Sequence, residues 1–579
     1  MFLVGLALLV CAYAVGWSWA WWLLLPGAAF VGLMAFHERT LRAKRRCTLL
    51  VRFYEQGLAR LKGKWAGKGE QGGGLAPVDH PFAHDIDLFG EGSLFELVCA
   101  ASTKAGKQRL ADWFCEPASA AVMRARQEAV RELTHDLELR EELAVCGAEV
   151  EAKVTPVMLT DWASRPSTLP VTRLRAIVLA LALAAVAAWV LSCLTGGVLF
   201  SWAVFLAAAA VFLWVRRPLR DITRSAEGPL RELVSTRPVF ACLERERFQC
   251  ALLAELHGTL SAGKVPASRH IARLERLQYT AETLQRNMGL GLVAALVYVL
   301  GSYGALAAFL TFVVLGQVLL TLSLEAWRAQ WGGRVPQWLS AVGTLEAVSS
   351  LACYAYEHPD DAFPEVVDDG ACFRAIGLGH PLIGDDKCVR NDVVLGEAPR
   401  LQIVSGSNMS GKSTLLASVG QNVVLARAGA PVRARQLVLS PLALGATIFV
   451  HGSIQRGASQ FYAELLRLRD MMKVALGEYP LLFLLDEILH GTNSHDRRIG
   501  ASALMRMFMG LGAIGFITTH DLALTAIAEQ LGVEAVNVHF ASRFEGGELR
   551  FDYKLKPGVV QESNALLLME SLGLLRENA

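Results

Sequence analysis

The sequence predicts two kinds of structure within one chain of 579 residues. An α/β domain with a buried parallel sheet is expected over residues 365–579, and an all-helical region interrupted by apolar hairpins is expected before it. Two observations indicate the α/β domain: short apolar runs recur in the last third of the chain, and each ends in a polar motif. A third observation indicates the helical region and its apolar hairpins. Before residue 360, apolar positions recur at helical spacing, and three uncharged runs interrupt this pattern.

The strongest motif is the stretch LQIVSGSNMSGKST at residues 401–414, which fits the phosphate-loop pattern G-x-x-x-x-G-K-[ST] without a mismatch. An apolar strand precedes the loop and a helix begins at about Lys412, so backbone N–H groups and the positive end of the helix face one anion. Lys412 is expected to contact the β- and γ-phosphates, and the Ser413 hydroxyl to hold Mg²⁺. The motif therefore predicts that ATP and Mg²⁺ bind to Gly406, Ser407, Asn408, Met409, Ser410, Gly411, Lys412, Ser413 and Thr414.

A second apolar run, at residues 481–485, ends in the tandem acids Asp486 and Glu487. A buried strand that delivers two carboxylates at its end is the Walker B arrangement of phosphate-loop ATPases. We expect Asp486 to be a second Mg²⁺ ligand and Glu487 to polarise the attacking water. The two acids therefore predict an ATP-hydrolysing site, in which the positive charge of Lys412 faces the negative charge of the phosphates.

A third apolar run, residues 513–517, ends in Thr518-Thr519-His520. A lone histidine after a strand is more often a cap or a solvated turn residue. Here it follows the Walker B strand by one helix, where an ABC-type ATPase keeps its switch histidine. We therefore expect His520 to lie beside the γ-phosphate and to take part in catalysis.

These motifs resemble those of the MutS family of DNA mismatch repair ATPases. GSNMSGKST (406–414) resembles the MutS phosphate loop, and LLDEILHGTNSHD (484–496) resembles its Walker B segment. GASQFYAEL (457–465) resembles the family's form of the ABC signature, Ser-x-Phe-x-x-Glu. His380-Pro381 and Asn391-Asp392 match the lead-in to the domain, so the resemblance covers about residues 365–575.

The resemblance implies an ABC-type ATPase domain that works as a head-to-tail homodimer. Ser459 would then reach the γ-phosphate bound by the partner subunit. It also implies binding of mismatched or branched double-stranded DNA. One position departs from the family: an aromatic residue that stacks on adenine often stands three residues before the matching asparagine, where this chain has Cys388.

Residues 2–36 carry no charge and are too long for one straight span. Gly16-Trp17-Ser18-Trp19 near the middle predicts a turn, and hence a transmembrane hairpin over residues 1–36. A cleaved signal peptide is disfavoured because no basic segment precedes the apolar run. The basic residues of 37–46 predict a cytoplasmic flank, and residues 37–77 a juxtamembrane helix with a Gly-rich linker.

Residues 176–215 form a second uncharged run with Gly196-Gly197 near its middle and arginines on both sides. This pattern predicts a second transmembrane hairpin over 173–216 with both ends in the cytoplasm. The third uncharged run, 287–324, has a shorter first half, so it fits a third membrane hairpin and a buried core helix equally well. The overall expectation is a multi-pass protein of the inner membrane with a cytoplasmic ATPase domain.

Between the hairpins, residues 78–172 and 217–364 are expected to form helices. The first of these segments resembles, more loosely, the start of the MutS core domain, where a Thr-x-x-Gly turn leads into an Arg-x-x-Ala-Val helix. Thr103, Gly106, Arg126, Ala129 and Val130 stand in those places. From the residues alone, the same pattern reads as an ordinary helical bundle.

Composition limits the kinds of partner that the protein is expected to bind. The net charge of +2 gives no overall basic bias, and the 11 cysteines form no C-x-x-C pair that would indicate a zinc site. We expect a transmembrane hairpin and a short linker where MutS proteins have their mismatch-reading and connector domains. Two functions follow: an ATPase that binds mismatched or structured DNA at the membrane, or an ATP-driven switch that acts on a membrane or protein partner without DNA. An ABC transporter ranks last because the usual L-S-G-G-Q signature is absent.

Overall fold

The computed structural model describes residues 20–75, 77, 79–148, 156–166, 169–261, 265–287, 303–368, 370–448, 460–545 and 548–560, and it divides into two compact units, residues 1–59 and 60–579. In the first unit the described residues all belong to helix α2 (Ala20–Leu61). Its residues 28–48 are exposed, and Arg42 pairs with Glu38 one turn away. The turn predicted at residues 16–19 lies outside the described residues.

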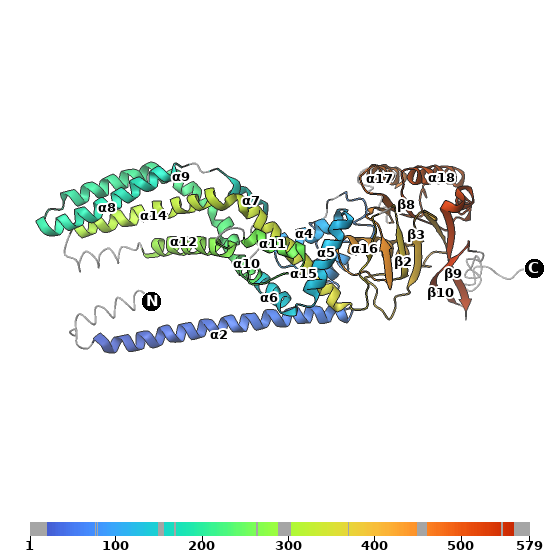
Figure 1. Ribbon diagram of the computed structural model, residues 1–579, viewed down its shortest axis with the longest axis horizontal. Coiled ribbons are helices and arrows are strands. Elements are labelled where there is room, and N and C mark those ends of the chain that lie inside the picture. The colour runs from blue at the N-terminus through green and yellow to red at the C-terminus, as the bar shows by residue number, and fades with distance from the viewer. Residues whose placement is uncertain are drawn as a thin grey trace, which may run out of the picture. The chain divides into compact units, whose positions relative to one another are not determined.

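The helical part of the second unit surrounds one long central helix, α15 (Val335–Glu357), which is buried along most of its length (Figure 1). Helices α4, α5 and α11 pack against it. The Thr-x-x-Gly turn is an N-cap, because the Thr103 hydroxyl accepts a hydrogen bond from the Gly106 N–H at the start of α4. The helices of this region are α3 (Leu94–Val98), α4 (Lys104–Cys115), α5 (Ala120–Thr134), α6 (Leu137–Ala148), α7 (Pro156–Ser164), α10 (Arg237–Leu243), α11 (Ala251–Ser261) and α12 (Ala267–Asn287).

Three long apolar helices pack together as a bundle: α8 (Val171–Thr195), α9 (Leu199–Ser235) and α14 (Tyr303–Trp331). Helix α8 ends at Gly196, whose left-handed backbone (φ +71°) lets the chain turn into α9. These two helices form a helical hairpin that includes residues 173–216, and α9 continues beyond them to Ser235. The first half of the third predicted hairpin, residues 288–302, lies outside the described residues.

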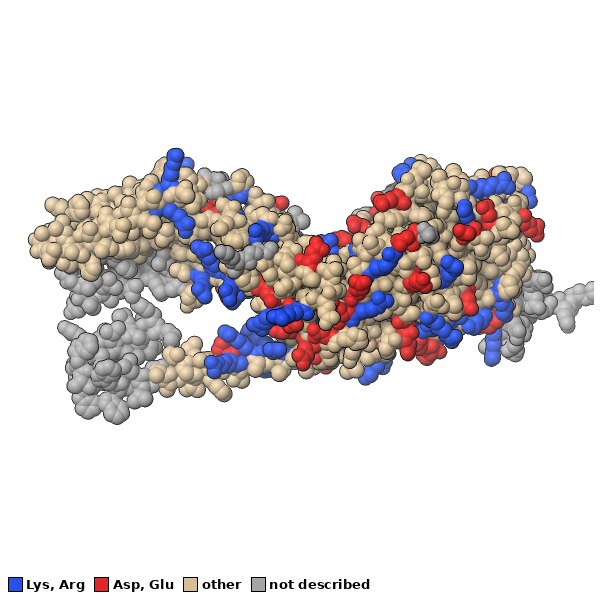
Figure 2. All heavy atoms as spheres, viewed as in Figure 1, with Lys and Arg blue, Asp and Glu red and all other residues tan. Residues whose placement is uncertain are grey.

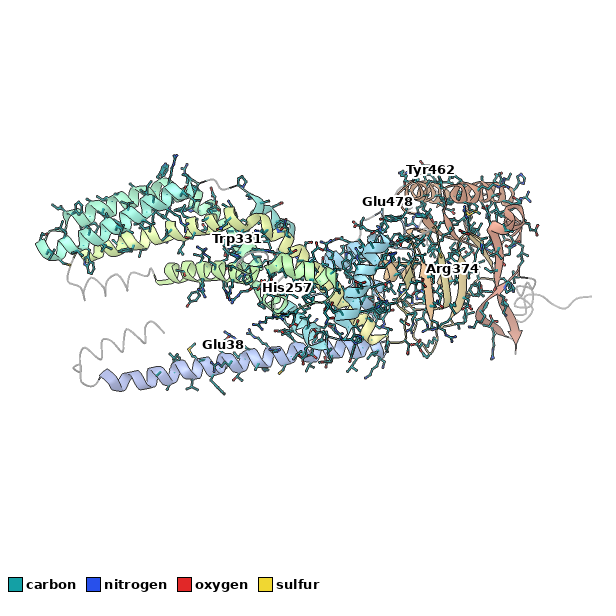
Figure 3. All side chains as sticks on the ribbon, in the orientation of Figure 1. Glu38, His257, Trp331, Arg374, Tyr462 and Glu478 are labelled. Atoms are coloured by element: carbon teal, nitrogen blue, oxygen red, sulfur yellow. The ribbon has the colours of Figure 1, made fainter. Side chains whose placement is uncertain are left out.

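A small set of apolar side chains from all three helices joins the bundle, including Val178, Ala208 and Val318. Within the described residues, the segments 171–195, 199–243 and 310–357 contain stretches long and apolar enough to cross a membrane. Trp331, at the end of α14 (labelled in Figure 3), lies against His270 of α12, with 3.7 Å between ring centroids and an angle of 33° between the rings. The short 3-10 helix η2 (Gly332–Arg334) then connects α14 to α15.

The C-terminal part contains two sheets. The larger has the strand order β10-β9-β4-β8-β7-β6, in which neighbouring strands are parallel except for the antiparallel pair β9 and β10. Its strands are β4 (Leu401–Ser405), β6 (Ala443–Thr447), β7 (Leu481–Asp486), β8 (Ile514–Thr519), β9 (Ala535–Glu545) and β10 (Glu548–Pro557). The smaller sheet, β1-β5-β2-β3, consists of β1 (Glu365–Val366), β2 (Phe373–Leu378), β3 (Asn391–Leu395) and β5 (Gln436–Leu439). Arg374 marks β2 in Figure 3.

Helices cover both faces of the larger sheet. Alternate side chains of one strand enter different cores: Leu482 and Leu484 of β7 face one core, and Leu481, Phe483 and Leu485 face the other. The first core includes α16 (Lys412–Ala428), which is buried along nearly its whole length. The second includes residues of α17 (Gln460–Ala475), α18 (Ser494–Gly510) and α19 (Ala526–Leu531).

The helical region and the sheet domain share the first core, which runs from Phe82 to Phe540. Helix α16 lies between them, with the sheet on one side and α4 and α5 on the other. Polar contacts also cross this junction: the Ile448 N–H donates to Asp85 (2.8 Å), and Arg126 donates to the carbonyl of Arg427 (2.8 Å). The sheet domain is therefore built onto the helices and does not stand apart from them.

Candidate functional site

The functional residues gather where three neighbouring parallel strands end. β4, β8 and β7 lie side by side, and the pairs Ser405–Thr519 and Asp486–Thr518 are in register. Parallel strands place their carboxyl ends at the same sheet edge, which is where ligands bind in open α/β sheets. Each strand is mostly apolar, because both of its faces are covered, and the buried Gln402 of β4 donates a hydrogen bond to the Val394 carbonyl.

The loop after β4 has the backbone that a phosphate cradle requires. Gly411 has a φ of +100°, and a Cβ there would lie 3.2 Å from the Tyr553 ring. Met409 also has a positive φ (+67°), and its side chain is exposed. The Lys412 ammonium donates to the carbonyls of Gly406 (2.9 Å) and Ser407 (3.0 Å), so it is folded back over the loop.

The residues of this loop fit a bound phosphate chain. The buried hydroxyls of Ser407 and Ser410 have no hydrogen-bond partner within the described residues, and the Lys412 side chain is 5% exposed. Burial lowers the pKa of Lys412, although the nearby Glu487 and Asp486 oppose this shift. Phosphate oxygens would supply the missing acceptors and a full negative charge for the buried ammonium. The predicted loop residues Asn408 and Thr414 line a cavity that begins at this loop.

The predicted Mg²⁺ ligands come together. The Ser413 hydroxyl donates to Oδ2 of Asp486 at 2.5 Å, although the residues are far apart in the sequence. The hydroxyl of Thr518, on the neighbouring strand, donates to Oδ1 of the same carboxylate. A hydroxyl and a carboxylate oxygen side by side are the hard ligands that Mg²⁺ takes from a protein that also binds its phosphates. Thr518 orients Asp486, a role that the sequence did not suggest.

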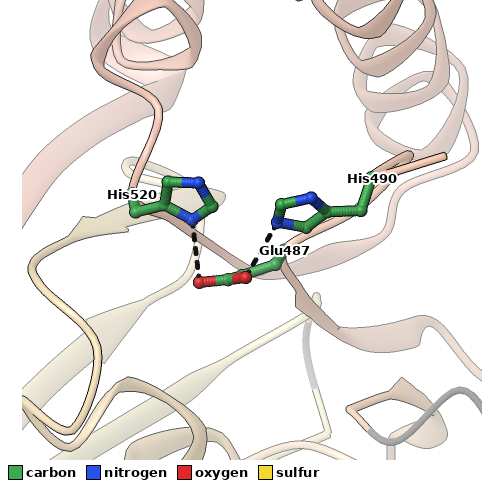
Figure 4. A group of neighbouring side chains, drawn as sticks. All are labelled: Glu487, His490 and His520. Carbon is green, nitrogen blue, oxygen red and sulfur yellow. Dashed lines mark hydrogen bonds and ion pairs between the residues drawn. The ribbon is translucent and has the colours of Figure 1, made fainter. Parts of the chain in front are cut away.

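Glu487, the residue after β7, lies beside two imidazoles, which Figure 4 shows, and beside the Lys412 ammonium. Its Oε1 is 3.0 Å from Nδ1 of His520 and 3.7 Å from the Lys412 ammonium, and its Oε2 is 2.9 Å from Nε2 of His490. Burial favours the protonated carboxyl, but the hydrogen bonds and charges of His520, Lys412 and His490 outweigh it, so the pKa of Glu487 is lowered. The site therefore holds an ionised carboxylate at neutral pH, 27% exposed to solvent.

The signature segment is described only from residue 460 onward, so Ser459, the predicted contact to a partner subunit, lies outside the described residues. The remaining part is helix α17. Its buried Glu464 accepts a hydrogen bond from the Leu489 N–H at 2.6 Å, and Tyr462 is exposed (Figure 3). A Cβ on Gly491 would lie 2.6 Å from Cβ of Phe461. The signature helix thus packs directly on the loop that follows the Walker B strand.

A cavity of about 810 Å³ extends from the phosphate loop toward β3 and β10. Cys388 lines it, at the place where the family pattern led us to expect a contact with the base. Tyr553 of β10 also lines it, beside the phosphate loop. The Asn391 side chain fixes this strand by donating to the Tyr553 carbonyl (3.0 Å) and accepting from the Leu555 N–H (2.8 Å).

Tyr553 and His490, like Thr518, are site residues that the sequence did not reveal. Tyr553 follows no recognisable nucleotide motif, and its place depends on how β10 pairs with β9. His490 lies within residues 484–496, whose resemblance to the MutS Walker B segment assigned no role to this histidine. The feature of the sequence that could have identified His490 as a site residue is its spacing of three residues from Glu487.

Comparison with known proteins agrees with this geometry. Residues 402–576 match the family model for MutS domain V. The chain is 34% identical to "Endonuclease MutS2" of Thermus thermophilus over 246 residues, which is 42% of this chain and 31% of that protein. It is 31% identical to "DNA mismatch repair protein MutS 2" of Halobacterium salinarum over 238 residues, or 40% of this chain and 27% of that protein. The matches thus span about a third or less of these relatives.

Proposed function

We propose, from the premise that this chain belongs to the MutS family through its C-terminal domain, that it is a membrane-anchored ATPase which converts ATP and water to ADP and phosphate. One observation carries the proposal: Lys412 and Ser413, after β4, and Asp486 and Glu487, at the end of β7, line one cavity. MutS domain V is an ATPase-type domain, which supports the same chemistry.

Each of these residues has a distinct part in hydrolysis. Lys412 and the loop N–H groups hold the β- and γ-phosphates. Ser413 and Asp486 hold Mg²⁺, which neutralises charge on the phosphates when it is bound. Glu487 accepts a hydrogen bond from the attacking water and orients it toward the γ-phosphorus, while His520 holds the Glu487 carboxylate. Tyr553 offers an aromatic face to the base, which compensates for the absence of an aromatic residue at position 388.

We further propose that two copies close on ATP head to tail, with Ser459 of each reaching the other's γ-phosphate. The packing of the signature helix on the Walker B loop supports this. A contact between the signature helix and the partner subunit's nucleotide would also shift the Walker B loop. The Glu487→Gln variant with ATP should then be a dimer, whereas the same variant with an added Ser459→Ala change should remain a monomer. Light scattering in detergent measures the difference.

The apolar bundle is proposed to cross the membrane. Large apolar side chains on α8 and α9 face solvent; among them Leu183 is 72% exposed, Leu199 86% and Trp214 70%. Residues 176–215 contain no charge, and one end of the bundle shows no Lys, Arg, Asp or Glu in Figure 2. Leaving this surface in water would be costly, whereas lipid tails would cover it.

Two candidate functions of the ATP-driven conformational change remain to be distinguished. Family membership favours binding of mismatched or branched DNA, whereas the apolar bundle favours a switch that acts on a membrane or protein partner. The test is binding of the detergent-solubilised protein to homoduplex, mismatched and four-way-junction DNA, with ATP or ADP and with Glu487→Gln. Structure-selective binding that depends on nucleotide supports the DNA function. No binding at about 50 mM salt, where phosphate contacts are strong, together with intact ATP hydrolysis, supports the switch.

A further inference from the structure

Two imidazoles converge on the Glu487 carboxylate from different elements. His490 lies in the loop after β7, and His520 lies just after β8 (Figure 4). Their ring nitrogens Nε2 and Nδ1 lie 2.9 Å and 3.0 Å from the two carboxylate oxygens of Glu487. The two rings stack at 26° with 5.0 Å between their centroids. Among the described residues, this is the group of His, Cys, Asp and Glu that could hold a metal ion.

The donor set differs from that of the Mg²⁺ site next to it. Ser413 and Asp486 offer oxygen only, which suits Mg²⁺. Two imidazole nitrogens with one carboxylate suit a borderline ion such as Zn²⁺, or Co²⁺ in its place, and leave a coordination position open. Adjacent sites of different hardness can therefore take different ions from the same solution.

The spacing is close to what one such ion requires. The ligand atoms all lie within 4.8 Å of one another. With bonds of about 2.0–2.1 Å, one Zn²⁺ joins ligand atoms separated by less than roughly 4 Å, so a small ring rotation closes the site. Room for that rotation exists, because the side chains of His490 and His520 are 44% and 45% exposed.

The backbone that carries His490 is fixed. Arg497 donates to the carbonyls of Leu489 (3.1 Å) and His490 (3.2 Å), while Glu464 accepts from the Leu489 N–H. Two of the three ligands thus lie on a segment that is anchored from α17 and α18. Such anchoring lowers the entropy that is lost when the ion is bound.

We propose that Glu487, His490 and His520 form a second metal site that takes Zn²⁺ or an ion of its class. Occupation of the site holds the Glu487 carboxylate and removes it from the attacking water. The site would make ATP hydrolysis sensitive to transition metals at a fixed Mg²⁺ concentration. This consequence rests on the proposed ATPase function, but the existence of the site does not.

The test is a Co²⁺ titration of the tag-free, detergent-solubilised chain without nucleotide, followed by the visible absorption of the bound ion. One Co²⁺ per chain with the intense bands of low-coordinate cobalt, displaced by Zn²⁺, is the expected result. His490→Gln and Glu487→Gln should each weaken Co²⁺ binding by at least about tenfold, the loss that is usual even for outer-shell partners of a metal. His495→Gln is the matched control, because His495 is exposed on the same segment and is not in the cluster.

The absence of the absorption bands, or bands that survive in His490→Gln, would overturn the proposal and leave only hydrogen bonds from the histidines to Glu487. A second measurement is the inhibition of ATP hydrolysis by Zn²⁺ at constant Mg²⁺, relative to each variant's own metal-free rate. Inhibition should need at least about tenfold more Zn²⁺ in His490→Gln than in the His495→Gln control. Should the chain not hydrolyse ATP, the cobalt titration still decides the site while the proposed function fails.

Discussion

At the scale of single residues, the adjacent acids Asp486 and Glu487 have different surroundings. Asp486 is engaged by two hydroxyls, and Glu487 by two imidazoles and an ammonium. The strand end separates them, because Glu487 has a φ of +48° and leaves the direction of the strand. In the proposed mechanism, Asp486 would hold the metal ion and Glu487 would orient the attacking water.

The Glu487→Gln variant should retain ATP binding and lose at least about 100-fold in single-turnover hydrolysis, since a general base typically contributes that much. Binding should persist because Lys412 and Ser413 are unchanged. Fluorescent-nucleotide binding and rapid-quench hydrolysis measure the two effects. Lys412→Ala is the counterpart and should lose binding itself. Equal hydrolysis rates in the Glu487→Gln variant and the unaltered chain would rule out this role for Glu487.

Tyr553 lines the cavity beside the phosphate loop, and its ring is proposed to contact the base of a bound nucleotide. Replacing Tyr553 with Ala should weaken nucleotide binding by about 1–3 kcal/mol, the usual value of one base–aromatic stack. Tyr553→Phe keeps the ring and should restore affinity. Calorimetric titration with ADP compares the three proteins. Equal losses in both variants would indicate that the hydroxyl, and not the ring face, makes the contact.

At the scale of elements, the phosphate-loop helix α16 ends against α5. Its C-cap Gly429 has a φ of +91°, and an added Cβ would lie 2.5 Å from Cβ of Arg126. Gly429→Ala should therefore destabilise the protein by more than about 2 kcal/mol, because strain and a clash with a packed helix combine. Gly512→Ala is the control: its φ is +80° but nothing lies within 4 Å of the added Cβ, so backbone strain of about 1 kcal/mol remains. Thermal unfolding of both variants should rank them in this order.

The three strands that carry the site motifs could be predicted from the sequence because each motif follows a largely apolar strand. The strands expected at 401–405, 481–485 and 513–517 are β4, β7 and β8 to within a residue or two. The smaller sheet could not be predicted, since β1 has two residues and β5 pairs with strands distant in sequence. Tyr553 and Thr518 were missed for a similar reason: their roles follow from strand pairing, which local patterns do not encode.

At the scale of the whole molecule, labelling of the exposed cysteines can test the proposed membrane topology. The proposed transmembrane hairpin over 173–216, with both ends in the cytoplasm, would place Cys193, near the α8–α9 turn, on the opposite side of the membrane from Cys47, which follows the basic cluster. A membrane-impermeant maleimide applied to intact cells should label Cys193 and not Cys47. Cys193→Ser should abolish that labelling, and cell lysis should expose Cys47. Labelling of Cys47 in intact cells would reverse the proposed orientation.

The continuity of the first hydrophobic core, from Phe82 to Phe540, bears on how this protein can be divided or recombined. A fragment that began at residue 365 would leave one side of α16 without α4 and α5, and would expose apolar surface that is now covered. Expressed alone, such a fragment should aggregate. A chimera that exchanged the ATPase domain would need to carry residues 80–134 from the same parent, because the exchangeable module is defined by shared side-chain contacts and is discontinuous in sequence.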